Sequence, residues 1–169
     1  MKVFFIRHGE TTGDVENRYG GDYDDRLTEK GEAQSEALGQ QLNDSGIEII
    51  FASSLVRAQE TATILSKHTG APVSSDEGLR ERNQYGVLTG MIKDEAIRKH
   101  PEMVELLKDR LNTIEGGESY EAFSDRISVA FWNIVNNQDK NIAIVSHGGP
   151  LRVLFRDILD CGEIDSVGD

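Results

Sequence analysis

The sequence predicts an α/β fold: a three-layer α/β/α sandwich with a mainly parallel central sheet. Short apolar runs rich in β-branched and aromatic residues alternate along the chain with longer segments whose apolar residues recur every three or four positions. The first pattern is typical of strands buried on both faces, and the second of helices with one buried face. Strands and helices that alternate in this way are joined by right-handed crossovers, so the strands are expected to pair in parallel.

Three runs have the composition of buried strands. The first is VFFI at residues 3–6, the second is IEIIF at 47–51, and the third is IAIV at 142–145. In each run the apolar residues stand at nearly successive positions rather than one helical turn apart. We expect all three to lie in one sheet.

One helix is expected before the second strand in the sequence, and one after it. Thr28 is the expected N-cap of the first, which has a small apolar face and ends near Gly46. The second follows Ser54 and ends at Gly70, a residue type that commonly closes helices.

Two more helices are expected in the second half of the chain. One starts at about Ser119 and has a wide apolar stripe. The other has Pro150 in its first turn, where the missing N–H of proline leaves no hydrogen bond unmade. Residues 92–114 are more polar and contain Pro101, so residues 87–117 are expected to form a short, irregular helical excursion over one end of the sheet.

Composition limits the class of protein. A chain of 169 residues can bury a substantial core, so residues 1–169 are expected to form one domain. No apolar stretch reaches the length of a membrane span or resembles a signal peptide, which predicts a cytoplasmic protein with no membrane partner. Cys161 is the only cysteine, so an internal disulfide and a cysteine-based zinc site are excluded.

The chain is strongly acidic. It has 30 Asp and Glu residues against 18 Lys and Arg residues, a formal net charge of −12 that would repel nucleic acid. A phosphorylated ligand would therefore need a local cluster of arginines to overcome the repulsion.

Histidine and arginine residues follow the ends of the three predicted strands. Arg7 and His8 come after the first, Arg57 lies one turn into the helix after the second, and His147 follows the third, just before Gly148. Ligands bind beyond the carboxyl ends of the strands in α/β sheets, so we expect these residues to converge there. Guanidinium groups bind phosphate bidentately, and glycines leave helix N-terminal N–H groups open to an anion. The combination predicts a phosphoryl pocket with a histidine nucleophile or a stabilising cation.

Each of these features has a simpler explanation on its own. Arg-His after a strand is usually a surface turn, Arg57 could pair with Glu60 on its own helix, and HGGP at 147–150 could be turn chemistry alone. Their shared position at strand ends favours a functional site.

Six segments, in order along nearly the whole chain, resemble the histidine phosphatase superfamily, in the branch of cofactor-dependent phosphoglycerate mutases and related small phosphatases. They are RHGET at 7–11, NRYGGDYDDRLTEKG at 17–31, SSLVRAQETA at 53–62, LRERNQYGVLTG at 79–90, GGES at 116–119 and VSHGGPLR at 145–152. The resemblance implies a phosphoglycerate mutase-like fold, with residues 87–117 over the active site.

The resemblance also implies a phosphohistidine mechanism. His8 would be the nucleophile, and Arg7, Arg57 and His147 would hold the transferred phosphoryl oxygens. Glu81 would protonate the leaving oxygen and then activate water. On the bare sequence Glu10, Glu60, Glu77 and Glu118 are equally plausible carboxylates; only the family pattern selects Glu81.

The implied site needs neither a metal nor a cofactor, because arginines and a protonated histidine would do the electrostatic work that Mg²⁺ does elsewhere. Asp14, Gly20, Gly21 and Gly148 would bind substrate, a small phosphorylated metabolite. The sequence leaves a homodimer open.

Other polar residues are expected outside the chemistry. Arg80 and Arg82 are expected to be solvated, although either could reach a substrate carboxylate. His68 and His100 are expected to be structural or solvated, and the acidic stretch DYDD at 22–25 is expected to form a solvated loop near the pocket mouth.

The chain departs from the family pattern at two places in the site. Asp14, six residues after His8, stands where the family usually has an asparagine that donates to the phosphoryl group. An aspartate there would repel a dianion unless it is protonated or turned away. The stretch from Glu81 to Gly86 is also one residue longer than the common spacing, so the loop with the proposed acid could sit differently.

A phosphomonoester phosphatase is favoured over a phosphoglycerate mutase. The family's mutases carry an inserted segment with two adjacent arginines, whereas residues 91–119 are short and contain no Arg-Arg pair. The mutase stays as the alternative, as does a noncatalytic protein that binds phosphorylated ligands. A metallohydrolase using His8, His147 and Glu81 is disfavoured, because the arginines would repel a cation and compact metal-binding spacings are lacking.

Overall fold

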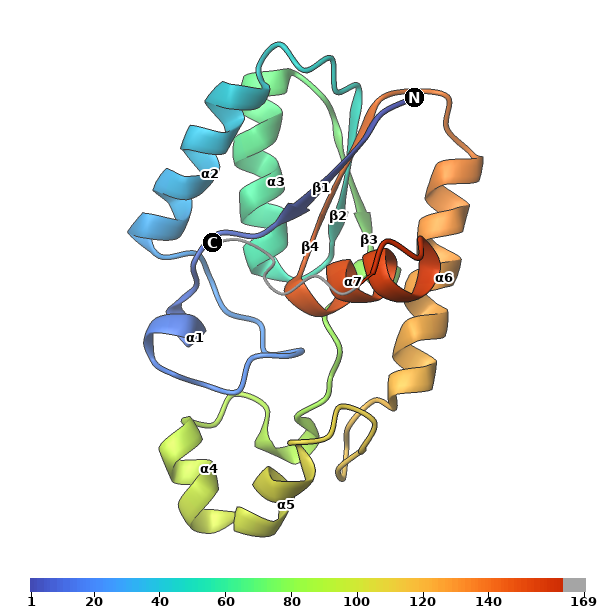
Figure 1. The fold of residues 1–169 in the computed structure, drawn as a ribbon. Helices are drawn as coiled ribbons and strands as arrows, with labels where there is room; N and C mark the ends of the chain where they lie inside the picture. Colours follow the sequence, from blue (N-terminus) through green and yellow to red (C-terminus); the bar gives the residue numbers. More distant parts are fainter. Residues whose placement is uncertain (163–169) are drawn as a thin grey trace.

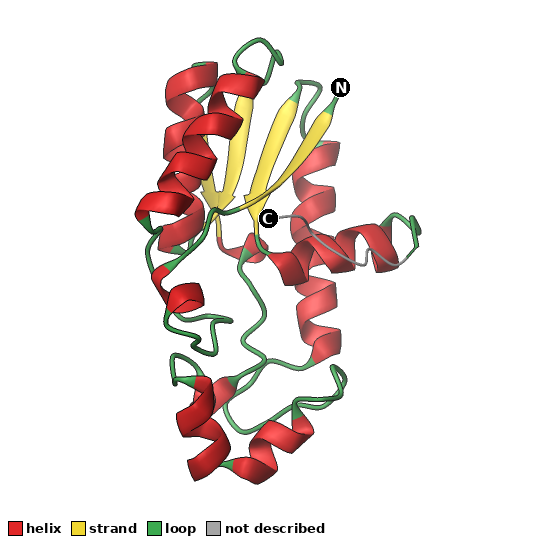
Figure 2. Ribbon diagram, turned by 60° about the vertical axis from the view of Figure 1, so that its left-hand side comes forward, coloured by secondary structure: helices red, strands yellow, loops and turns green. Residues whose placement is uncertain are grey.

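The structure, a computed structural model, describes residues 1–162. A four-stranded sheet lies between two layers of helices (Figures 1 and 2). The strands are β1 (Val3–Arg7), β2 (Ile49–Ser53), β3 (Val73–Asp76) and β4 (Ile142–Ser146), in the spatial order β1-β4-β2-β3. All three pairings are parallel, which confirms the predicted α/β/α sandwich.

Helices α2 and α3 cover one face of the sheet, and α6 and α7 cover the other (Figure 2). Two 3₁₀ turns, Glu77–Leu79 and Gly86–Leu88, flank the loop that contains Glu81. The helices are α1 (Thr12–Val15), α2 (Glu29–Leu42), α3 (Val56–Thr69), α4 (Lys93–Lys99), α5 (Pro101–Leu106), α6 (Tyr120–Asn136) and α7 (Gly148–Val153), the last continued by a π-helical turn at Leu154–Ile158.

Strand β4 lies inside the sheet and is buried at every position. Its side chains alternate between the two layers: Ile142 and Ile144 belong to the core beneath α6 and α7, and Ala143 and Val145 to the core beneath α2 and α3. A strand covered on both faces must be apolar throughout, which explains why IAIV lacks an alternating pattern.

The predicted helix ends are largely confirmed. The Thr28 side chain accepts a hydrogen bond from the N–H of Gly31 and so caps α2, and Ser119 caps α6 in the same way. Gly70 closes α3 with a φ of 72°, a left-handed conformation that favours glycine. Helix α2 ends at Leu42, before the expected Gly46, whose φ of 75° instead belongs to the loop into β2.

Strand β3 was not predicted from the sequence, and β2 begins two residues later than predicted. Strand β3 reads VSSD, with one apolar residue, and lies at the edge of the sheet, where it pairs only with β2. An edge strand that is partly exposed needs no continuous apolar run, so apolar patterning could not find it. Strand β2 runs on to Ser53, and this polar end lies beside His147.

Residues 87–117 contain α4 and α5 and lie beyond the carboxyl ends of the strands (Figure 1). They have a small core of their own around Leu88, Ala96 and Ile114. Within residues 1–162, the structure contains no helix long and apolar enough to cross a membrane.

Candidate active site

The register of β1 and β4 brings two histidines together. Arg7, the last residue of β1, pairs with Ser146, the last residue of β4. The N–H of His8 then donates to the Ser146 carbonyl at 3.1 Å, and the ring centroids of His8 and His147 are 5.0 Å apart. Parallel pairing therefore places residues 139 positions apart in neighbouring places, as the strand-end pattern predicts.

Arg57 reaches both imidazoles from the first turn of α3. Its Nε–H is 3.2 Å from Nε2 of His8 and 3.2 Å from Nδ1 of His147. A guanidinium can only donate, so both ring nitrogens face this single N–H with a lone pair.

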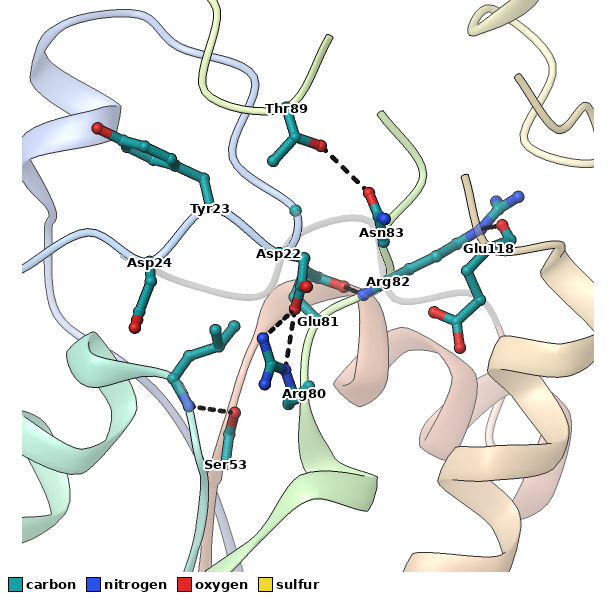
Figure 3. Close-up of polar contacts among 12 residues, drawn as sticks. Asp22, Tyr23, Asp24, Ser53, Arg80, Glu81, Arg82, Asn83, Thr89 and Glu118 are labelled. Atoms are coloured by element: carbon teal, nitrogen blue, oxygen red, sulfur yellow. Dashed lines mark hydrogen bonds and ion pairs between the residues drawn. The ribbon is translucent and has the colours of Figure 1, made fainter. Parts of the chain in front are cut away.

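The remaining ring nitrogens settle the tautomers. Nδ1 of His8 lies 2.8 Å from the carbonyl of Gly9, which can only accept, so Nδ1 carries the hydrogen and Nε2 is unprotonated. Nε2 of His147 lies 2.7 Å from Oγ of Ser53 and donates to it. Ser53 in turn accepts from the N–H of Leu55 (Figure 3).

Both histidines are neutral near pH 7. Burial, followed by the charges of Arg57 and Arg7, lowers the pKa of His8 to about 4. Burial and Arg57 likewise lower the pKa of His147 well below its ordinary value. Two buried imidazoles beside arginines do not hold a proton in this ligand-free site. The protonated histidine expected beside a bound phosphoryl group stays a prediction.

The other donors of Arg57 are fixed by the segment that precedes α2. Nη1 donates to the Tyr23 carbonyl at 2.6 Å and to Oδ1 of Asp25 at 2.9 Å, and Nη2 donates to the Gly21 carbonyl at 2.8 Å. Both partners of the Arg57–Asp25 ion pair are buried. The guanidinium is thereby held with its Nε edge toward the histidines.

The loop expected at 22–25 is present but only partly solvated. Asp24 is exposed, whereas Asp25 is buried, and each of the three aspartates has a partner. Asp25 binds Arg57, Asp24 accepts from the N–H of Val56 at the start of α3, and Asp22 accepts from Nε and Nη2 of Arg80 (Figure 3). These contacts are long-range in sequence, so local pattern could not reveal them.

The alternative pairing of Arg57 with Glu60 is not formed. Glu60 accepts instead from the side chain of Arg26 and from the N–H of Leu27.

Glu81 is held by two backbone N–H groups. Oε2 accepts from Gly149 at 2.9 Å and Oε1 from Arg82 at 2.8 Å. Burial raises the pKa of Glu81 despite these bonds, which favour the ionised form. A Cβ at Gly149 would lie 2.1 Å from Oε1 of Glu81, so only glycine allows this approach.

Arg82 is buried, and its predicted solvation is wrong. Its Nε donates to the carbonyl of Glu118 (Figure 3). Its Nη1 donates to the carbonyl of Arg110 and its Nη2 to that of Asn112. Arg126 on α6 binds the Glu118 carboxylate through two nitrogens. A sequence pattern cannot distinguish an arginine that satisfies buried carbonyls from a solvated one.

Asp14 is turned toward the start of its own helix. Its Oδ2 accepts from the N–H of Thr11 at 3.0 Å, while Oγ1 of Thr11 accepts from the N–H of Asp14. This reciprocal capping of α1 engages the carboxylate that was expected to repel a dianion.

A cavity of about 400 Å³, a size suited to a small ligand, is lined by several of these groups but not by the buried His147. Among the expected site residues, it is lined by Arg7, His8, Asp14, Gly20, Gly21, Arg57, Glu81 and Gly148. Its wall also includes residues that were not predicted to belong to the site: Arg18, Arg82, Lys93, Arg110, Arg152, Tyr85 and Tyr120.

Helical spacing could have identified one of these residues. Arg152 lies four positions after Gly148 on α7 and so faces the same side of that helix. Arg110 lies between elements and follows no pattern, so only the structure brings it to the cavity.

The other two histidines lie elsewhere. Nε2 of His68 forms a hydrogen bond with Oε2 of Glu36 at 2.6 Å, and His100 lies at the junction of α4 and α5. In the described part of the chain, no three His, Cys, Asp or Glu side chains form a group that could hold a metal ion.

Comparison with known proteins gives consistent matches. The sequence model of the histidine phosphatase superfamily (branch 1) matches residues 3–165. Phosphoglycerate mutase-like protein 4 of Arabidopsis thaliana is 31% identical over 91% of this chain and 69% of its own. "Probable phosphoglycerate mutase GpmB" of Erwinia tasmaniensis is 35% identical over 94% of this chain and 75% of its own.

Solved structures share the fold. Bacillus stearothermophilus YhfR has a TM-score of 0.85 and 32% identity, covering 94% of this chain and 79% of its own. The alpha-ribazole phosphatase of Shigella flexneri has a TM-score of 0.83 and 30% identity, with coverages of 92% and 79%. The mycobacterial glucosyl-3-phosphoglycerate phosphatase, solved with VO3, has a TM-score of 0.82 and 28% identity, with coverages of 92% and 80%.

Proposed function

Because the chain belongs to the histidine phosphatase superfamily (branch 1), we propose that it is a phosphomonoester phosphatase that acts through a phosphohistidine on His8. The observation that carries the proposal is the tautomer of His8. The Gly9 carbonyl keeps the hydrogen on Nδ1, which leaves the lone pair of Nε2 beside Arg57 at the cavity. A neutral imidazole with this orientation can attack phosphorus.

In the first step, Nε2 of His8 forms a bond to phosphorus while the bond from phosphorus to the ester oxygen breaks in line. Arg7 and Arg57 stabilise the charge on the phosphoryl oxygens, and His147 adds a further polar group. Glu81, whose pKa is raised by burial, gives its proton to the leaving oxygen, so the alcohol departs neutral.

In the second step, the Glu81 carboxylate takes a proton from water, and the resulting hydroxide oxygen bonds to phosphorus as the P–N bond breaks. Inorganic phosphate leaves, and both Glu81 and His8 return to their starting states. The arginines supply the positive charge throughout, so the proposed reaction needs no metal ion.

A mutase is the second candidate, supported by the relatives named as phosphoglycerate mutases. A mutase must return the phosphoryl group to the bound product before water attacks. The phosphatase is preferred because residues 91–119 lack the Arg-Arg pair implied for mutases. Supplying 3-phosphoglycerate distinguishes the two, since a mutase forms 2-phosphoglycerate faster than it releases phosphate.

Hydrolysis of p-nitrophenyl phosphate in the presence of EDTA tests the proposal. We expect the wild-type protein to be active and His8→Ala to be inactive, with the matched control His100→Ala active. Radiolabelled phosphate should be trapped on the wild-type protein in a form that is stable in alkali and labile in acid, as a phosphohistidine is. Wild-type protein as inert as His8→Ala would favour the noncatalytic alternative, and activity that EDTA removes and zinc restores would favour a metallohydrolase.

Glu81→Gln provides a second readout of the same mechanism. Loss of the general acid should slow hydrolysis of an alkyl phosphate by about 10²–10⁴-fold. The first step with p-nitrophenyl phosphate should be slowed less, because nitrophenolate leaves without a proton. An equal loss in the first step for both substrates would contradict the role given to Glu81.

A further inference from the structure

Asp25 is a buried carboxylate that takes no part in the bond-breaking steps proposed above. Its exposed fraction is 7%, and it is one of the residues that line the cavity. A buried carboxylate is tolerated only when its oxygens accept hydrogen bonds or its charge is paired. Both oxygens of Asp25 are engaged, and their two partners belong to different elements.

The first oxygen, Oδ1, orients Arg57. A guanidinium has five N–H donors and no acceptor. Nη1 of Arg57 donates to the Tyr23 carbonyl and to Oδ1 of Asp25, and Nη2 donates to the carbonyl of Gly21. The Nε–H, which faces the two histidines, and one Nη2–H are left for phosphoryl oxygens. Among the Nη partners only Asp25 is charged, and charge-assisted hydrogen bonds are stronger than those to carbonyls.

The second oxygen, Oδ2, reaches the first turn of α1. It accepts from the N–H of Gly13 at 3.1 Å, a donor that has no acceptor within a helix so close to its start. The approach is tight, because a Cβ on Gly13 would lie 2.5 Å from Oδ2. Thr11, Gly13 and Asp14 line the cavity. One side chain therefore joins Arg57 to a turn that forms part of the cavity wall.

These two bonds require a carboxylate. Each oxygen of a carboxylate accepts, whereas an amide has one accepting oxygen and an NH₂ group that only donates. Asp25→Asn could keep the bond to Arg57 or the bond to Gly13, and would turn its NH₂ toward the other donor. It would also leave the buried charge of Arg57 without its partner.

We propose that Asp25 is a positioning residue for Arg57. Its carboxylate holds the guanidinium with Nε–H toward the phosphoryl oxygens beside His8 and His147, and it fixes this orientation relative to α1. Asp25 acts through Arg57 and does not itself bind substrate. The inference rests on the proposed phosphatase activity and adds a residue on which the rate of that reaction depends.

Asp25→Asn separates the orientation of Arg57 from its charge. Arg57 keeps its charge in this variant and loses the compensating carboxylate, so its attraction for a phosphate dianion should not decrease. Its donors are no longer aimed, and a displacement of about 1 Å at a catalytic group can cost about a hundredfold in rate. With p-nitrophenyl phosphate we expect kcat to fall by about tenfold to a hundredfold. The inhibition constant of inorganic phosphate should stay the same or decrease.

Gly13→Ala tests the same contact from the other side. The new Cβ displaces Oδ2 while the charge of Asp25 remains, so kcat should again fall. Asp24→Asn is the matched control, because it removes the same charge from the neighbouring, exposed residue and its amide oxygen can still accept from the N–H of Val56. It should keep the wild-type kcat. Thermal melts establish that each variant is folded, and Gly13→Ala serves if Asp25→Asn is not.

A double-mutant cycle shows whether Asp25 acts through Arg57. Arg57→Gln alone should be strongly impaired. Adding Asp25→Asn to it should lower kcat no further, since no guanidinium is left to orient. A residue that merely supports the fold would lower kcat by the same factor in both backgrounds.

The outcomes separate this proposal from the proposed function. The positioning role is wrong, and the phosphatase stands, if Asp25→Asn keeps the wild-type kcat or lowers it equally in both backgrounds. It is also wrong if the inhibition constant of phosphate rises as much as kcat falls, because anion binding and not orientation is then lost. If no phosphate ester is hydrolysed above the level of His8→Ala, the proposed function itself fails.

Discussion

Single hydrogen bonds decide what the two histidines can do. The Gly9 carbonyl fixes the hydrogen of His8 on Nδ1, and the Ser53 hydroxyl fixes that of His147 on Nε2. The two rings therefore present opposite nitrogens to Arg57, although they follow equivalent strands. This asymmetry gives His8 the role of nucleophile in the proposed reaction and leaves His147 to contact the oxygens.

The depressed pKa of His8 can be tested directly. NMR titration of the imidazole should give a midpoint of about 4, and not the 6.5 of an ordinary histidine. Because the unfolded chain takes up this proton at a higher pH than the folded protein, the associated stability is complete above about pH 6.5 and is lost as the pH falls toward 4. Urea midpoints should therefore fall with pH less steeply in His8→Asn than in wild type. A midpoint near 6.5 would contradict the burial argument.

Residue types at strand ends were predictable from sequence, whereas their partners were not. His8, Arg57 and His147 could be placed together because parallel strands end at one edge of a sheet. Asp25 and Arg82 were misjudged as solvated, because the groups they bind come from distant segments. The family pattern, and not residue spacing, selected Glu81.

At the level of elements, the start of α7 and the loop after the first 3₁₀ turn form one unit. Helix α7 begins directly after β4, and its Gly149 N–H meets the Glu81 carboxylate. Free N–H groups are available there because the first turn of a helix has no internal acceptors. The start of α7 thus helps to hold the proposed acid in place.

Adding one methyl group to α7 should displace Glu81. In Gly149→Ala the new Cβ would lie 2.1 Å from Oε1, so the carboxylate must move. We expect kcat for an alkyl phosphate to fall by about a hundredfold or more, as expected when a general acid is lost. Gly148→Ala, whose Cβ would meet only Nη1 of Arg152 at 3.5 Å, should lose less. Equal losses in both variants, with unchanged thermal melts, would contradict the contact as the cause.

Elements with strong local signals were predicted, and an element that depends on its neighbours was not. Thr28, Gly70 and Ser119 mark helix ends through their own side chains or conformations. Strand β3 exists because β2 provides hydrogen-bonding partners, and its sequence VSSD carries little signal of its own.

In the molecule as a whole, β4 joins two cores that share no side chains. One core lies under α6 and α7 and the other under α2 and α3, and β4 contributes to both. The fold class was predictable because this double coverage forces apolar residues onto successive positions of the strand. The position of residues 110–118 was not predictable, since Arg82 holds them through backbone carbonyls and Arg126 through the Glu118 carboxylate.

The central strand should dominate stability. Ile144 is fully buried beneath α6, so Ile144→Ala should lower the free energy of unfolding by about 2–5 kcal/mol, which urea denaturation measures. Val129→Ala, at an exposed position on α6, is the control and should change it little. Similar losses in both variants would contradict the assignment of the core.

Arg57 has one Nε–H to offer, and the lone pairs of His8 and His147 share it. A phosphate ion that binds beside the two histidines brings further hydrogen-bond acceptors. These would compete with the two ring nitrogens for the single Nε–H of Arg57. Protonation of Nδ1 of His147 would meet this shortfall once an anion stabilises the resulting charge, although burial and Arg57 lower the pKa of this residue in the ligand-free site. Anion binding would then consume a proton, and the affinity for phosphate would weaken as the solution becomes more alkaline. In this protein, the proton that adds a positive charge to the pocket would bind together with the ligand.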